Sequence, residues 1–248
     1  MTFPCPVDVA ECSRRGIAVA NVPSAVDEPT SDTAMFLILA CLRQYTVALH
    51  EAQQGLFNSQ LGLSNNPRGK ILGIVGLGGI GKALARKAKV FGMNVQYYNR
   101  TRIPLDQESQ LGVSYVGSLD ALLSSSDVVS LNVPLNSGTY HLISERALST
   151  MKSTAILINT ARGTIVDEIA LIEALDRGTI AGAGLDVYEN EPDIPKALLH
   201  NAQAVCLPHV GTVTQETQRE MEAICLANLR YSILHGSPPY VVPEQNSR

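Results

Sequence analysis

The segment KILGIVGLGGIG, residues 70–81, decides the fold of this chain. Its first part, residues 71–75, has the apolar composition of a strand that is buried on both faces of a sheet. Gly76, Gly78 and Gly81 follow in the pattern G-x-G-x-x-G, and a helical pattern begins within the same turn. The first glycine permits a tight turn, the second lets a pyrophosphate approach the backbone, and the third lets helix and strand pack closely.

This glycine-rich turn predicts a dinucleotide-binding site. The start of the helix offers free N–H groups and the positive end of its dipole to phosphates. A turn that is merely tight is the alternative, but here strand, turn, helix and next strand follow in order. We place Gly79 and Ile80 in the same predicted site as the three motif glycines.

The rest of the chain alternates β-branched runs with helical patterns, which is typical of a doubly wound parallel α/β sheet, a Rossmann domain. The predicted strands are residues 71–75, 94–98, 113–116, 127–133, 155–159, 180–186 and 204–207. The predicted helices between them are residues 79–91, 119–125, 145–151 and 167–177. Two long helices, residues 33–53 (capped at Ser31 or Asp32) and residues 214–235, flank this block. Residues 9–15 read as a short helix and residues 16–22 as one strand.

Composition narrows the class of protein. With 248 residues, 45% hydrophobic and 17% charged, the chain can form a sizeable core. A net charge of −4 argues against a nucleic-acid partner. The longest apolar run, residues 34–42, is too short to span a membrane, and the N-terminus shows no secretory signal. The five cysteines, an odd number without C-x-x-C spacing, indicate reduced thiols in the cytoplasm and no metal site.

The residues after the second predicted strand bear on cofactor choice. An NAD-specific site would have Asp or Glu there to bind the ribose 2′-hydroxyl. This chain has Asn99, Arg100, Thr101 and Arg102 instead. Because arginine attracts a 2′-phosphate, we predict that NADP(H) is preferred and that NAD(H) remains possible. The alternative is that both arginines are solvated loop charges.

Three further segments follow predicted strands and converge at the edge where such sheets bind ligands: residues 159–163, 185–192 and 208–211. Their motifs INTARG, LDVYENEP and PHVG, in this order after GLGGIG, resemble the D-isomer-specific 2-hydroxyacid dehydrogenase family. That family includes glyoxylate/hydroxypyruvate reductases, phosphoglycerate dehydrogenases and formate dehydrogenases. The resemblance runs from about residue 8 to residue 242.

The resemblance implies roles for three catalytic residues. Arg162 matches the arginine that holds the substrate's carboxylate and carbonyl oxygen. His209 matches the histidine that exchanges a proton with the carbonyl oxygen, and Glu191 matches the carboxylate paired with it. The further cofactor contacts that it implies are Val133, Pro134, Thr160, Ala161, Arg162, Asp186, His209 and Gly211.

The chemistry of these residue types agrees with those roles. Reduction of a 2-oxo acid places negative charge on the carbonyl oxygen, so a proton donor and a cation are needed there. Taken singly, Arg162, Glu191 and His209 would each read as ordinary loop residues. Their joint order favours an oxidoreductase that transfers a hydride between NADP(H) and a small 2-oxo or 2-hydroxy acid. The remaining histidines and the tyrosines of residues 97–98 read as structural.

The resemblance also implies a domain plan. Residues 1–24 are expected to be the remnant of a second, flavodoxin-like substrate domain, residues 25–213 the NAD(P)-binding domain, and residues 214–248 a helix and tail that belong to the substrate domain. MTFPCP, residues 1–6, stands where the family has a Gly-rich substrate loop. A homodimer formed through the helix of residues 33–53 is expected. The alternative function is a non-catalytic dinucleotide-binding module, either a truncated paralogue or a cofactor sensor like the corepressors of this fold.

Overall fold

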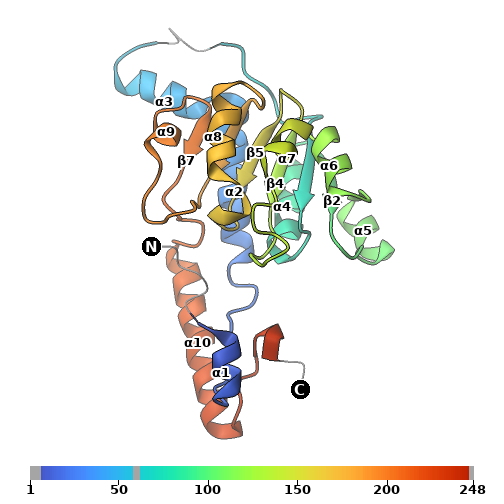
Figure 1. The fold of residues 1–248 in the computed structure, drawn as a ribbon, viewed down its shortest axis with the longest axis vertical. Helices are drawn as coiled ribbons and strands as arrows, with labels where there is room; N and C mark the ends of the chain where they lie inside the picture. The colour runs from blue at the N-terminus through green and yellow to red at the C-terminus, as the bar shows by residue number, and fades with distance from the viewer. Residues whose placement is uncertain (1–6, 58–61, 246–248) are drawn as a thin grey trace.

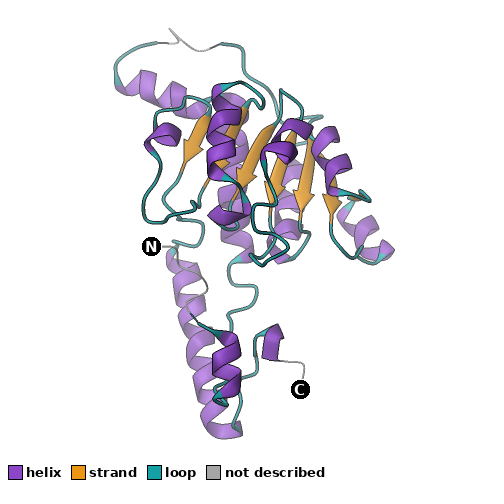
Figure 2. Ribbon diagram, in the orientation of Figure 1, coloured by secondary structure: helices purple, strands orange, loops and turns teal. Residues whose placement is uncertain are grey.

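The chain forms one parallel sheet with helices on both faces (Figures 1 and 2). This computed structural model describes residues 7–57 and 62–245, so the MTFPCP segment lies outside the described residues. The sheet has the strand order β3-β2-β1-β4-β5-β6-β7, and every neighbouring pair is parallel. The strands are β1 (Ile71–Val75), β2 (Asn94–Tyr98), β3 (Ser114–Tyr115), β4 (Val128–Leu131), β5 (Ile156–Asn159), β6 (Gly182–Leu185) and β7 (Ala204–Cys206). The doubly wound Rossmann fold is therefore confirmed.

Two apolar clusters fill the space between sheet and helices. On one face Leu72 and Ile74 of β1 pack with side chains of α2 (Asp27–Arg43) and α4 (Gly79–Val90). On the other face Val75 packs with α6 (Leu119–Ser125), α7 (Glu145–Thr150) and α8 (Glu168–Asp176). Successive side chains of a strand point to opposite faces, which is why one short strand contributes to both clusters.

The prediction of one helix over residues 33–53 is wrong in two respects: the helix begins earlier, and it is broken in the middle. Helix α2 already begins at Asp27, because Pro29 needs no N–H partner in the first turn. Gln44 then takes a left-handed conformation (φ 53°), and α3 (Tyr45–Gln53) leaves at a bend of 74°. The carbonyl of Leu42 accepts a hydrogen bond from the N–H of Asn65, so the returning chain satisfies the end of α2.

The strand predicted for residues 16–22 does not form either. Only an isolated antiparallel bridge, between Ala20 and Val241, exists in this segment. No neighbouring strand extends the pairing, and a lone pair of short strands is marginal in water. Two helices were also missed: α5 (Leu105–Leu111) and the four-residue α9 (Lys196–Leu199).

Helix α10 (Gln215–His235) extends away from the sheet, and the short helix η2 (Pro243–Gln245) contacts α1 (Val9–Arg14) (Figure 1). Hydrogen bonds join these distant parts of the sequence: Asn228 Nδ2 donates to the carbonyl of Asn21, and Gln245 Nε2 donates to the carbonyl of Ile17. The division at residues 24 and 214 remains a prediction.

None of the helices within the described residues is by itself long and apolar enough to cross a membrane. The bent pair α2 and α3 reaches that length and composition only when the two are taken together.

Candidate active site

A groove of about 1150 Å³ runs along the carboxyl edge of the sheet. Because all strands are parallel, the loops that follow β1, β4, β5, β6 and β7 meet at this edge. Its lining is Ile80, Asn132, Val133, Pro134, Leu135, Asn136, Ser137, Tyr140, Thr160, Ala161, Arg162, Gly163, Thr164, Tyr188, Glu189, Glu191, His209 and Glu244.

The groove brings together many of the residues predicted from sequence. It contains Ile80, Val133, Pro134, Thr160, Ala161, Arg162, Glu191 and His209. Outside its lining are Gly76, Gly78, Gly79, Gly81, Asn99, Arg100, Thr101, Arg102, Asp186 and Gly211. All three predicted catalytic residues therefore share one groove.

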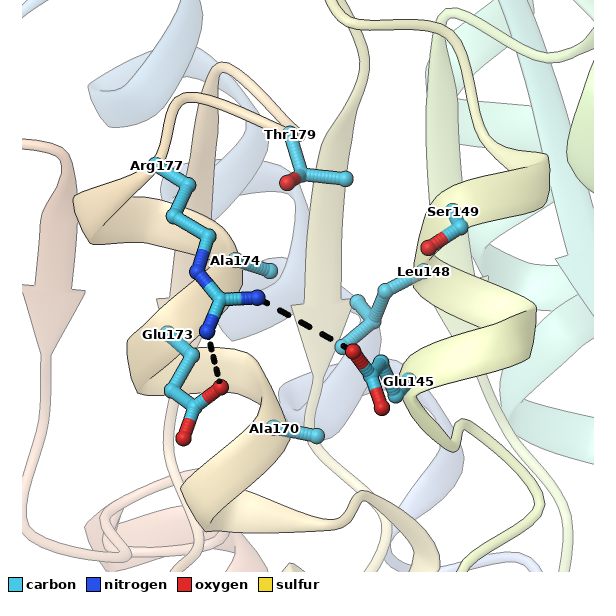
Figure 3. A pocket seen from close by; sticks show the side chains of 8 residues that line it. All are labelled: Glu145, Leu148, Ser149, Ala170, Glu173, Ala174, Arg177 and Thr179. Atoms are coloured by element: carbon cyan, nitrogen blue, oxygen red, sulfur yellow. Dashed lines mark hydrogen bonds and ion pairs between the residues drawn. The ribbon is translucent and has the colours of Figure 1, made fainter.

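A much smaller hollow lies between α7 and α8 (Figure 3). Its volume is about 30 Å³, close to the space of a single water molecule. Arg177 spans it, with Nη2 2.8 Å from Glu173 and Nη1 3.9 Å from Glu145. The pair with Glu145 joins the C-terminal end of α8 to α7, the pair with Glu173 lies at that same end of α8, and the hollow is too small for a metabolite.

The glycine turn is built by contacts that only its backbone can make. Gly76 has φ +95°, and a Cβ there would lie 2.6 Å from the carbonyl oxygen of Asn132. The N–H of Leu77 donates to Asn99 Oδ1 at 2.8 Å. A Cβ added at Gly78 would meet no atom within 4 Å, so the backbone there is open to an approaching ligand. The Asn99 side chain thus shapes the turn.

Arg162 follows β5 on a turn that the Asn159 side chain holds together. Asn159 Nδ2 donates to the carbonyl of Arg162 at 2.9 Å, and Asn159 Oδ1 accepts from the N–H of Ala161 at 3.0 Å. The Arg162 side chain is exposed, and among the residues that the structure describes its one partner is the Ala161 carbonyl, which accepts from Nη1 at 2.6 Å. The remaining N–H groups are available to an anionic ligand.

His209 lies on a loop that the buried Asp186 holds in place. The Asp186 carboxylate accepts from the N–H groups of Val210 and Gly211, each at 2.8 Å. Burial raises the pKa of Asp186, although these two hydrogen bonds oppose the shift. His209 itself has φ +56°, an uncommon conformation for a residue that is not glycine.

The imidazole of His209 is paired with Glu191. His209 Nδ1 lies 2.8 Å from Glu191 Oε2, while Glu191 Oε1 accepts from the N–H of Tyr188 at 3.0 Å. The Tyr188 hydroxyl in turn donates to the carbonyl of Leu207 at 2.9 Å. Both oxygens of Glu191 are therefore fixed, and Nε2 of His209 is the ring nitrogen left for a ligand.

The two arginines of the loop after β2 differ in their contacts. Arg102 donates through Nε and Nη2 to the buried Glu108, both at 2.7 Å. The hydroxyl of Tyr97 donates to the same carboxylate at 2.5 Å, so Tyr97 does more than pack within its strand. Arg100 is exposed, and within the described residues it has no hydrogen-bonded or ion-paired partner.

Two polar groups of the groove lack partners in the part of the chain that the structure describes: one belongs to Thr160, which is among the residues predicted from sequence, and the other to Asn132, which sequence reasoning missed. Asn132 Oδ1 and Thr160 Oγ1 are buried without a hydrogen-bond partner among the described residues. Asn132 directly follows β4 at the edge where ligands bind, and this position could have indicated its role. These orphaned groups and the open backbone at Gly78 fit a nicotinamide dinucleotide, whose amide, ribose and phosphates supply matching donors and acceptors. Sequence reasoning also missed two other groove residues: Glu189, although it lies within the LDVYENEP motif, and Tyr140, which carried no sequence signal.

Among residues 7–57 and 62–245, no group of three or more His, Cys, Asp or Glu side chains is arranged to hold a metal ion. Cys12, Cys41, Cys206 and Cys225 are free thiols.

Comparison with known proteins gives the family. Residues 35–211 match the family described as D-isomer specific 2-hydroxyacid dehydrogenase, NAD binding domain. The 4-methyl-2-oxopentanoate reductase A of Aspergillus oryzae is 46% identical over 97% of this chain and 72% of its own length. A glyoxylate reductase from Paecilomyes thermophila superposes with a TM-score of 0.92 at 47% identity, covering 96% of this chain and 72% of that one.

A third relative carries a cofactor in its crystal structure. It is the NADPH-dependent glyoxylate/hydroxypyruvate reductase of Sinorhizobium meliloti, solved with NADP and malonate. It has a TM-score of 0.89 and 37% identity, over 96% of this chain and 74% of its own. The ordered motifs, the parallel sheet and these relatives agree, and the chain therefore belongs to the D-isomer-specific 2-hydroxyacid dehydrogenase family, whose members are oxidoreductases.

Proposed function

We propose that this chain transfers a hydride between NADP(H) and a small 2-oxo or 2-hydroxy acid such as glyoxylate or hydroxypyruvate. The observation that carries the proposal is the His209–Glu191 pair, 2.8 Å apart, in the same groove as Arg162. Relatives named as glyoxylate reductase and 4-methyl-2-oxopentanoate reductase support this class of substrate. They also favour an enzyme over a module that binds a dinucleotide without turnover.

In this proposal His209 is the acid and base. The nicotinamide, when bound, supplies or accepts the hydride. Nδ1 of His209 is held by Glu191, so Nε2 gives a proton to the carbonyl oxygen during reduction and takes it back from the alcohol during oxidation. Glu191 fixes the orientation of the ring and stabilises the positive charge of the imidazolium.

Arg162 is the proposed substrate clamp. A guanidinium presents its N–H groups in a rigid fork that matches a carboxylate with two parallel hydrogen bonds. The bond from Nη1 to the Ala161 carbonyl turns the side chain without using up this fork. The same cation stabilises the negative charge that develops on the carbonyl oxygen.

The proposed cofactor site follows the sequence prediction. Its phosphate-binding part is Gly76, Gly78, Gly79, Ile80 and Gly81; Asn99, Arg100, Thr101 and Arg102 border the adenosine ribose; Val133, Pro134, Thr160, Ala161, Asp186 and Gly211 border the nicotinamide. The preference for NADP(H) rests mainly on Arg100, because Arg102 already shares its charge with Glu108. NAD(H) remains a slower alternative.

The test is the loss of reduced-cofactor absorbance when the chain meets glyoxylate, hydroxypyruvate or 4-methyl-2-oxopentanoate, with NADPH and NADH in parallel. We expect turnover, and a several-fold lower KM for NADPH. Replacing Arg100 by Ala should weaken NADPH binding about 10-fold and leave NADH binding unchanged. Equal use of both cofactors would contradict the preference, and binding without turnover on any 2-oxo acid would contradict the reaction.

A homodimer is part of the proposal. Helices α2 and α3 expose Phe36, Tyr45 and Leu49, which gives the chain an apolar surface beside its sheet. Light scattering at micromolar concentration should give about twice the chain mass. A monomeric mass would contradict it.

A further inference from the structure

Two histidine–glutamate pairs share one loop of the groove. The loop after β6 carries Glu191, which holds His209, and two residues earlier it carries Glu189. Glu189 Oε1 lies 2.7 Å from Nε2 of His141, on the segment that follows β4. The side chains of His141 and Glu189 are 29% and 21% exposed, so both are largely withdrawn from water.

His141 is fixed on its own side of the groove. It has φ +46°, and its N–H donates to the carbonyl of Thr164 at 2.9 Å. The ring of Tyr140 stacks on the imidazole, with centroids 4.1 Å apart and an interplanar angle of 13°. Two residues on, Ile143 bridges Val166 in parallel fashion. The stacked ring and these backbone contacts fix both the side chain and the segment of His141.

Glu189 is the point where three segments of the groove meet. Besides His141, its Oε1 accepts from the N–H of Glu168 at the start of α8, and its own N–H donates to Glu168 Oε2, both at 3.3 Å. The backbone of Tyr188 also packs closely against Gly163, because a Cβ at residue 163 would overlap the Tyr188 carbonyl group. The position of this loop therefore bears on both Glu191 and the turn of Arg162.

The charges around His141 are all acidic. Glu189 and Asp167 face its two ring nitrogens, the latter at 3.9 Å from Nδ1, and Glu168 lies behind Glu189. Burial, with the charge of Glu189 adding to it, raises the pKa of Glu168. Among the described residues no lysine or arginine pairs with these three carboxylates, and the imidazole of His141 faces two of them, Glu189 and Asp167.

We propose that His141 is a positioning residue: through Glu189 it clamps the loop that presents Glu191 to His209. The inference rests on the proposed function, since it assigns His141 a part in the same site without contact to the reacting atoms. Local sequence patterns do not single out His141 among the histidines, because its partner lies 48 residues away.

Two variants of His141 separate a clamp from a merely structural role. His141→Asn tolerates the left-handed backbone but is too short to reach Glu189. His141→Gln keeps an N–H donor of sufficient length, and Gln44 shows that this chain accommodates glutamine at positive φ. The matched control is His200→Asn, an exposed histidine that follows the short helix α9 as its C-cap.

We expect His141→Asn to lower kcat about 10- to 100-fold with the Kd for NADPH unchanged. His141→Gln should recover most of that loss, and His200→Asn should match the wild type. Equal losses in the Asn and Gln variants, or a parallel loss of NADPH affinity, would overturn the clamp in favour of a general structural role.

A second measurement does not depend on turnover. In protein with isotope-labelled histidine, the ring resonances of His209 should shift in His141→Asn and stay in place in His200→Asn. If the wild type reduces no 2-oxo acid, the proposed function fails, and a shifted His209 signal still supports the clamp. An unmoved His209 signal in folded His141→Asn overturns the clamp whatever the activity.

Discussion

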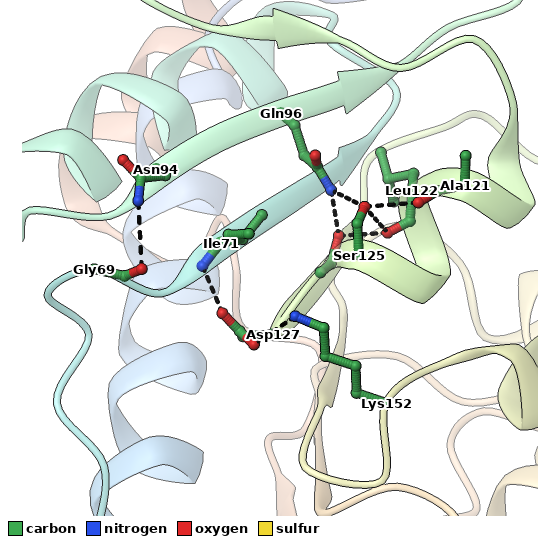
Figure 4. A network of polar contacts seen from close by, with 10 residues as sticks. Gly69, Ile71, Asn94, Gln96, Ala121, Leu122, Ser125, Asp127 and Lys152 are labelled. Carbon is green, nitrogen blue, oxygen red and sulfur yellow. Dashed lines mark hydrogen bonds and ion pairs between the residues drawn. The ribbon is translucent and has the colours of Figure 1, made fainter.

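The two edges of the sheet use polar side chains in opposite ways. At the amino edge they satisfy one another (Figure 4). Asp127 accepts from the N–H of Ile71 and from Lys152 Nζ, both at 2.8 Å. Gln96 Nε2 donates to the hydroxyls of Ser125 and Ser126, at 2.7 and 3.0 Å. These side chains stabilise the fold, and their polar groups are already paired with one another.

At the carboxyl edge the polar side chains are held in place, but several of their donors and acceptors have no partner within the described residues. Asn132 Oδ1 and Thr160 Oγ1 are buried without a partner in the described part of the chain. Within the described residues one ring nitrogen of His209 has a partner, and Arg162 lines the groove with a single N–H group engaged. A buried polar group without a partner costs stability, so its retention at one edge and not the other points to a ligand there.

Replacing His209 by Ala should have the largest effect on the carboxyl edge. Loss of a positioned acid and base lowers kcat about 100- to 10,000-fold, while the Kd for NADPH stays the same, because the glycine turn is untouched. Steady-state kinetics and cofactor titration by fluorescence measure the two quantities. A variant with normal kcat would remove His209 from the proposed mechanism.

Replacing Arg162 by Ala should lower kcat/KM about 100-fold, largely through KM, because the substrate carboxylate loses its charged hydrogen bonds. Arg162→Lys should recover only part of this, since an ammonium cannot form the two parallel bonds. Kinetics with glyoxylate at several concentrations separate KM from kcat. If Lys restores the full rate, a bidentate clamp is the wrong description of Arg162.

Replacing Asp127 by Ala tests the amino edge. The variant leaves the Ile71 N–H without its acceptor, so the free energy of unfolding should fall by about 2 kcal/mol with kcat unchanged. Lys152→Ala removes only a partly exposed ion pair and should cost about 1 kcal/mol or less. Urea unfolding followed by circular dichroism is suitable, because the chain contains no tryptophan. A drop in kcat without loss of stability would break the contrast between the edges.

The same contrast explains which parts were predictable from sequence. The strands and the glycine turn follow from local patterns: β1 and β2 begin and end where the sequence predicts. The pairing of His209 with Glu191 could be expected from the family motifs. The break at Gln44 could not, because it depends on Asn65 reaching back to the carbonyl of Leu42. His141 likewise depends on a contact that only the folded sheet creates.

Glu108 is an exception to the contrast between the two edges. It lies beside the loop that follows the carboxyl end of β2, yet its carboxylate is fully paired, with Arg102 and Tyr97. Hydrogen bonds from Arg102 and then from Tyr97 lower the pKa of Glu108 from 4.5 to about 2. Since the folded-state pKa is depressed, its contribution to stability is present above the unfolded value and is lost as pH falls from about 4.5 towards 2.

Glu108→Gln should therefore be less stable than the wild type at pH 6, and the difference should shrink steadily between pH 5 and pH 3. Urea unfolding at several pH values measures it, with Asp106→Asn, an exposed carboxylate on the same helix, as the matched control. A difference independent of pH would mean that the shape of the side chain matters and its charge does not. In that case the hydrogen bonds of this network, and not the charge of the Glu108 carboxylate, would stabilise the loop after β2.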